Sequence, residues 1–172
     1  MAGPSVTIDA SELDTLLRRF PQYENIIFDE MEAAMAGSLE VFKSEVVGRT
    51  PVGVTGAARQ SIGSFVRGRA PNFEGQVATS ILYGLPLERG RRPGKQPPTA
   101  PIELWVRRKL NVSDAEVSQV AFLIARAIGR RGTKGAEMFA KGFDAGKGPV
   151  DRLWQKVGKK AARRIEAEIN RI

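Results

Sequence analysis

Residues 23–47, YENIIFDEMEAAMAGSLEVFKSEVV, decide the fold, because they carry the longest helical periodicity in the early part of the chain. Apolar or small side chains recur there at steps of three or four, which places them on one helical face. They are Ile27, Met31, Met35, Ser38 or Leu39, Phe42 and Val46. Gly48 and Thr50-Pro51 end the pattern, since the residue before a proline avoids helical geometry. The stretch predicts a long helix whose apolar face must pack on other elements.

Residues 61–82 predict a β-hairpin. They mix β-branched and aromatic residues in short alternations, and Ala70-Pro71-Asn72 is typical of a turn between two strands. Together with the first helix, the hairpin predicts an α+β fold. We expect a single domain over residues 1–172, in which a small antiparallel sheet packs against the long N-terminal helix and further helices follow in the C-terminal half.

Three later stretches predict those helices. Residues 101–110 begin with Pro101, which suits a first helical turn, and the next helix has Ser113 and Glu116 in capping-box spacing and ends at Gly129 or Gly132. Residues 149–172 predict one long amphipathic helix at the end of the chain. Its expected apolar face is Val150, Leu153, Val157, Ala161, Ile165 and Ile169. Upstream of residue 23, residues 5–9 predict a short strand and residues 12–20 a brief helix capped by Ser11.

Charge is divided unevenly along the chain. Residues 1–50 hold nine acidic and four basic side chains, a net charge of −5, whereas residues 51–172 hold 10 acidic and 23 basic ones, a net of +13. A basic surface of this size suits nucleic acid, an acidic protein partner or solubility alone, since Coulomb attraction does not choose among polyanions.

Composition argues against an enzyme. The chain has no Cys and no His, which removes thiol nucleophiles, imidazole bases and the usual zinc ligands. The acids Asp9, Glu12 and Asp14 lack the spacing of a calcium loop. The glycine-containing segments 53–61 and 131–135 lack the ending of a P-loop. We therefore expect no catalytic residue, no cofactor and no metal, and, without an export signal or a membrane-spanning stretch, a cytosolic product.

Residues 88–100 predict an exposed basic loop, because Gly and Pro interrupt any helix or central strand there. The loop and the segment after the second of the later helices supply the candidate interface residues. These are Arg89, Arg91, Arg92, Lys95, Arg130, Arg131 and Lys134. The basic residues of the last helix, Lys156 to Arg164, are assigned to a solvated face. Trp105 and Trp154 are expected in the core.

Three motifs in order resemble a known family. They are RTPVGVTGAARQSI at 49–62, YGLPLERGRRPGKQPPTAPIELWVRRKL at 83–110 and FLIARAIGRRGTKGAEMF at 122–139. The run is similar to the signature of tail-completion proteins of long-tailed bacteriophages, the group related to the minor tail protein Z of phage lambda. Where that family has a single Asp between the Val and Thr of the first motif, this chain has Gly53-Val54.

The resemblance implies a structural virion protein of the phage neck, not an enzyme, which completes the tail and helps to join it to the head. Its implied partners are the tail-terminator ring and the head-closure protein, with DNA in the channel as a further contact. It also implies a homo-oligomeric ring, for which six copies is the number considered, and a location in the virion after assembly in the host cytoplasm. The alternative function is a basic DNA-binding accessory protein of phage or bacterial origin, which the charge of residues 51–172 would serve equally.

Overall fold

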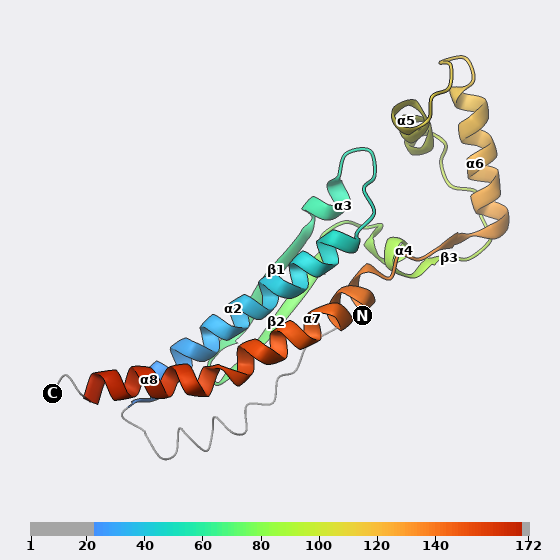
Figure 1. Ribbon diagram of the computed structural model, residues 1–172. Coiled ribbons are helices and arrows are strands. Elements are labelled where there is room, and N and C mark those ends of the chain that lie inside the picture. Colours follow the sequence, from blue (N-terminus) through green and yellow to red (C-terminus); the bar gives the residue numbers. More distant parts are fainter. Residues whose placement is uncertain (1–22, 170–172) are drawn as a thin grey trace. The chain divides into compact units, whose positions relative to one another are not determined.

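The computed structural model describes residues 23–169, which form two compact units (Figure 1). Unit 1 contains the described residues 23–48, 63–78 and 139–169, and unit 2 contains residues 49–62 and 79–138. The predicted strand at 5–9, the predicted helix at 12–20 and the side chain of Ile169 lie outside what the structure describes. The single-domain expectation stays a prediction, because compact units of one chain need not fold independently.

The first long helix of unit 1 is confirmed. Helix α2 spans Glu24–Arg49, and every residue expected on its apolar face is buried, together with Ala34. Ser38 lies on that face without an unpaired hydroxyl, since its Oγ donates to the carbonyl of Ala34 at 2.7 Å and accepts from Nε1 of Trp154 at 2.9 Å. A buried polar side chain is tolerated when its hydrogen bonds are made, so the helical stripe stays intact.

The predicted hairpin is also present. Strands β1 (Ile62–Arg69) and β2 (Asn72–Thr79) form a two-stranded antiparallel sheet with Ala70-Pro71 at the turn. Gly75 of β2 lies so close to α2 that a Cβ there would be 2.6 Å from Sδ of Met35 and 2.9 Å from Cδ2 of Leu39. The sheet thus packs directly on the helix, and the α+β fold class is confirmed.

The end of the chain differs from the prediction of one helix over 149–172. Helix α7 already begins at Met138 and runs to Gln155, and after a turn at Lys156 helix α8 spans Val157–Ile169. The sequence prediction began at residue 149 because proline resists a helix interior. Pro149 lies inside α7 nonetheless. The buried residues Phe139, Phe143 and Val150 of α7 offset the cost of the missing N–H, which is about 3 kcal/mol.

Helix α7 approaches α2 closely through two glycines. A Cβ on Gly142 would lie 3.0 Å from the backbone N and Cα of Val46, and one on Gly146 would lie 2.5 Å from the ring of Phe42. The rings of Phe42 and Phe143 meet beside them with centroids 4.7 Å apart. Because glycine has no side chain, the two helices pack at a distance that alanine would not permit at these positions.

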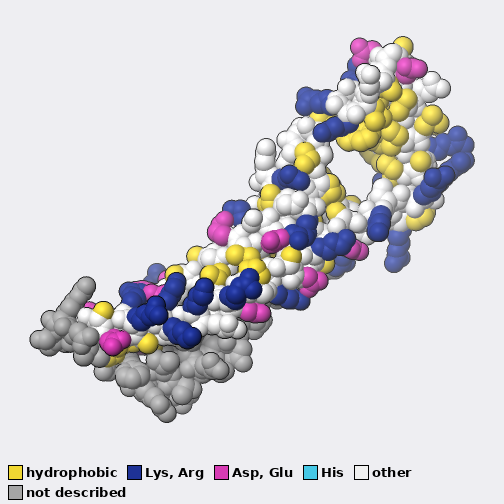
Figure 2. Space-filling view, in the orientation of Figure 1, with side chains coloured by type: hydrophobic (Ala, Val, Ile, Leu, Met, Phe, Trp, Pro, Cys, Tyr) yellow, Lys and Arg dark blue, Asp and Glu magenta, His cyan; other side chains and the backbone are white. Residues whose placement is uncertain are grey.

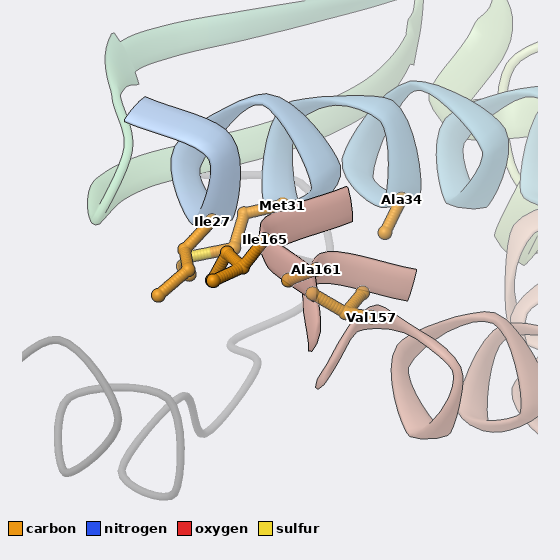
Figure 3. Packing of buried hydrophobic residues seen from close by; sticks show 6 residues of the cluster. All are labelled: Ile27, Met31, Ala34, Val157, Ala161 and Ile165. Atoms are coloured by element: carbon orange, nitrogen blue, oxygen red, sulfur yellow. The ribbon is translucent and has the colours of Figure 1, made fainter. Parts of the chain in front are cut away.

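Helix α8 completes the core of unit 1 at the other end of α2 (Figure 3). Ile27, Met31 and Ala34 of α2 face three buried residues of α8, Val157, Ala161 and Ile165. At the surface Arg164 donates to the carboxylates of Glu30 at 2.9 Å and Asp29 at 3.1 Å, which raises the pKa of the guanidinium. Arg164 and Asp29 are 46% and 63% exposed, and Glu30 is 14% exposed, so solvent screens much of this contact and it contributes about 1 kcal/mol. Apolar packing dominates.

Unit 2 is built from short elements. They are α3 (Ala57–Gln60), α4 (Gly84–Arg89), β3 (Gly90–Arg91), α5 (Ala100–Lys109), α6 (Val117–Arg131) and β4 (Thr133–Lys134). Both predicted helices are confirmed, with Pro101 in the first turn of α5 and Gly132 at the end of α6. Their small core has Val106, Val117 and Ala121 at its centre. The carboxylate of Glu116 accepts from the hydroxyl of Ser113 at 2.5 Å and from its amide at 3.2 Å, so the predicted pair is in contact just before α6, although only the amide bond is that of a capping box.

The prediction of a loop over 88–100 is wrong at its N-terminal end. Residues 88 and 89 close helix α4, and Gly90 and Arg91 form strand β3, which pairs antiparallel with β4. Gly90 lies opposite Lys134, and Arg91 lies opposite Thr133. Strand pairing so short leaves no alternation in the sequence, and its partner lies about forty residues away, so local patterns do not reveal it. Residues 92–99 are irregular, as expected.

Candidate interaction surface of unit 2

The β3–β4 pair brings the two predicted basic clusters together. Residues 89–95 and 130–135, which we call the basic ribbon, lie side by side, and paired Cα atoms in such a ladder are about 5 Å apart. The amide of Gly94 also donates to the carbonyl of Gly129 at 2.8 Å, which joins the irregular part of the first segment to the end of α6. All seven candidate interface residues therefore lie in one region of the fold.

Glycines allow the backbones of β3 and β4 to lie this close together. Gly132 has φ +72°, and a Cβ on it would overlap the carbonyl oxygen of Arg91. A Cβ on Gly90 would overlap the carbonyl of Thr133, and one on Gly135 would overlap that of Glu88. The glycines of the second and third motifs thus serve backbone packing. Residues 131–135 belong to a pair of antiparallel strands and do not form a phosphate-binding loop.

The cations of the ribbon are available to a ligand. Six of the seven are exposed, and Arg91 is half-buried because its guanidinium donates to the carbonyl of Lys95. No ion pair joins any of the seven to an acid within residues 23–169. Figure 2 shows dark blue Lys and Arg side chains gathered along α6 and near β3. The arrangement supports a strong local positive potential.

The two units differ sharply in charge. Unit 2 carries 13 Lys and Arg against five Asp and Glu, a net charge of +8, whereas the described residues of unit 1 carry 11 of each. The acidic residues of α2 are thus balanced within unit 1 by the basic residues of α7 and α8. The net charge of the whole protein resides in unit 2.

Exposed apolar side chains are a second feature of unit 2, and the sequence analysis missed them. Leu82 is fully exposed, and Tyr83 and Leu85 at the start of α4 are 51% and 52% exposed. Others lie on α5 and α6: Leu104, Trp105, Phe122 and Leu123. The expectation that Trp105 is a core residue is wrong, because Val106, its neighbour on α5, is the residue that enters the core. Trp154, also expected in the core, is partly buried and packs against the core cluster of unit 1, with its ring 6.3 Å from that of Phe73 between centroids.

The first motif forms a turn held by hydrogen bonds, of which one is buried and two are partly buried. The hydroxyl of Thr50, a fully buried residue, donates to Sδ of Met138 at 3.2 Å, and Nε of Arg59 donates to the carbonyl of Thr50 at 2.8 Å. Ser61 and Thr79 share a hydrogen bond of 2.7 Å between their hydroxyls. These contacts show that Thr50, Arg59 and Ser61 hold unit 2 in shape. Every residue of the three motifs belongs to this unit except Phe139.

Other kinds of site find little support in the described part of the chain. Residues 23–169 contain no group of three or more His, Cys, Asp or Glu side chains placed to hold a metal ion. No described helix combines the length and apolar character needed to cross a membrane. In comparisons with known proteins, no family model, curated protein or solved structure matches the chain.

Proposed function

We propose that this protein is a structural component of a bacteriophage neck, which completes the tail and helps to join it to the head by contacting the tail-terminator ring and the head-closure protein. In this proposal it has no catalytic role, and several copies form a ring in the virion. The particular family is proposed from the three motifs at 49–62, 83–110 and 122–139.

The observation that carries the proposal is the number of large apolar side chains that unit 2 leaves exposed. Among its described residues, seven hydrophobic side chains are buried and eight large ones are exposed. Contiguous or clustered apolar groups on a surface are typical of proteins whose partners cover them, and interface centres are enriched in aromatic and Arg side chains. A protein that assembles with neighbours is favoured over one that acts alone.

Deletion of the gene from its phage or prophage tests the proposal. We expect electron microscopy of the induced lysate to show filled heads and separate tails, and we expect addition of the purified protein to restore joined, infectious particles. Joined particles in normal number without the protein would remove it from the neck.

A pair of double variants tests which surface assembles. Leu82→Gln with Leu85→Gln removes exposed apolar groups of unit 2, and Phe65→Gln with Val66→Gln removes the two large exposed apolar groups of unit 1, 41% and 46% exposed, from β1. We expect the first pair to lower particle yield at least about tenfold, which corresponds to a loss of interface energy of about 1.4 kcal/mol. The second pair should retain the yield. Equal yields from both would separate unit 2 from the joining step.

A basic DNA-binding accessory protein is the alternative. The net charge of +8 in unit 2 supports it. That function needs no virion partner, so normal head–tail joining in the deletion strain, together with tight binding of the free protein to duplex DNA, would favour it.

A further inference from the structure

We propose that the basic ribbon binds the phosphate backbone of duplex DNA without reading its sequence. This inference goes beyond a role in joining heads to tails, because it concerns what the ribbon binds and not which proteins surround it. Its support is the composition, pairing and exposure of residues 89–95 and 130–135.

The composition of the ribbon suits phosphate more than a protein surface. Its 13 residues comprise seven Arg or Lys, four Gly, Pro93 and Thr133, with no acid and no large apolar side chain. Protein interfaces concentrate binding energy in buried aromatic and aliphatic anchors, and the ribbon has none. The exposed apolar residues of unit 2 lie elsewhere, at the start of α4 and on α5 and α6.

The backbone arrangement keeps the cations close together, and none of them has an ion-pair partner among the described residues. Pairing of Gly90 with Lys134 and of Arg91 with Thr133 sets each cation opposite an uncharged residue, so two basic segments lie on adjacent strands without like charges directly paired. The positive charge concentrated there favours the binding of an anion. A polyanion with regularly spaced charges satisfies several of these groups at once through charge-assisted hydrogen bonds.

The absence of stacking groups sets the kind of recognition. The ribbon has no Phe, Tyr or Trp on which an unpaired base could stack, and no Asn or Gln to read adenine. We infer that binding depends on phosphate charge, which duplex DNA presents at about one negative charge per 1.7 Å of helix axis. We therefore expect affinity for random duplex with a steep dependence on salt.

Two variants of equal charge test the proposal. The ribbon variant carries Arg89→Gln, Arg92→Gln, Arg130→Gln and Lys134→Gln, and it leaves the hydrogen bond of Arg91 to Lys95 in place. The control changes four exposed cations of α7–α8 in unit 1, Lys156, Lys159, Lys160 and Arg163, to Gln. Each variant lowers the net charge of the chain by four, from +8 to +4. Thermal unfolding followed by circular dichroism establishes that both are folded.

Fluorescence anisotropy with a random duplex of about 20 base pairs, over a series of salt concentrations, gives the result. For the intact protein we expect the logarithm of affinity to fall with the logarithm of salt at a slope of up to about −6, since each neutralised phosphate contributes about −0.9. The ribbon variant should reduce this slope by about 3 to 4, and the control by less than about 1. A ribbon variant that fails to fold is replaced by the two pairs Arg89→Gln with Arg92→Gln and Arg130→Gln with Lys134→Gln, each expected to reduce the slope by about 2.

Three outcomes would overturn the proposal. The first is salt-independent or undetectable binding of the intact protein to duplex, and the second is an equal loss of slope in both variants, which would mean that net charge alone acts. The third is binding of poly-glutamate of matched charge as tightly as duplex, which would assign the ribbon to an acidic protein. None of these results alters head–tail joining in the deletion strain, so the neck proposal stands or falls separately.

Discussion

Units 1 and 2 hold nearly equal numbers of described residues, 73 and 74, yet they are built in opposite ways. Unit 1 buries 14 hydrophobic side chains and exposes two large ones, Phe65 and Val66, whereas unit 2 buries seven and exposes eight. Unit 1 is electrically neutral, and unit 2 carries the whole net charge of +8. Apolar packing therefore stabilises unit 1, while much of the surface of unit 2 is suited to contact other molecules.

The comparison separates two reasons for a glycine. In unit 1, Gly142 and Gly146 let two helices approach, and the groups that they accommodate include the side chain of Phe42. In unit 2, Gly90, Gly132 and Gly135 let two backbones cross, and each accommodates a carbonyl oxygen. Side chains adjust more readily than backbone, so the crossing in unit 2 is the less tolerant of substitution.

The largest expected difference between the units comes from the same substitution made in each. Phe42→Ala should lower the free energy of unfolding by about 3–5 kcal/mol, because a 3% exposed ring packed on Phe143 leaves a cavity. Phe122 of α6 is 48% exposed, and Phe122→Ala should change the free energy of unfolding by less than about 0.5 kcal/mol. Urea unfolding followed by circular dichroism measures both, and similar losses from the two variants would remove the distinction between a packed unit and an open one.

The next effect concerns the close pairing of β3 with β4 in the basic ribbon. Gly132→Ala should lower the free energy of unfolding by about 1–3 kcal/mol, because alanine resists φ +72° and its Cβ would overlap the carbonyl of Arg91. Hydrogen exchange should show the loss at the amides of β3 and β4. Gly158→Ala in α8 is the matched control, since a Cβ there meets open space, and the added helix propensity should stabilise unit 1 by up to about 1 kcal/mol. An unchanged free energy of unfolding for Gly132→Ala would mean that the backbones of β3 and β4 are not tightly packed at this position.

The smallest effect is the pH dependence of the α6 start. Hydrogen bonds from the hydroxyl and then the amide of Ser113 lower the pKa of Glu116 below its usual value. A carboxyl whose pKa is lower in the folded state stabilises that state above its unfolded pKa, and the contribution disappears as pH falls through the lowered value. Glu116→Gln should therefore lower Tm slightly at neutral pH and leave it unchanged in acid. A Tm difference that grows in acid would contradict this assignment.

Elements with strong local signals were predictable. The period of Ile27, Met31, Met35, Phe42 and Val46 defines the buried face of α2, and a turn between two alternating segments defines the hairpin, because both patterns are complete within about 25 residues. The seven candidate cations were also found, since charge is visible without any knowledge of packing.

Other features depended on contacts between distant segments. Pro149 by itself predicts a helix boundary, and only burial of Phe139, Phe143 and Val150 explains why α7 continues through it. Leu82 and Trp105 are exposed because no other described segment packs over them, and hydrophobicity alone does not predict that exposure.

The sequence by itself determined the helical face of α2, the hairpin and the sign of the charge, because local periodicity and composition encode them. Tertiary structure alone decided that residues 89–95 and 130–134 lie side by side. Two strands of two residues each have no recognisable period, and they meet because the glycines at 90, 132 and 135 allow the backbones to cross.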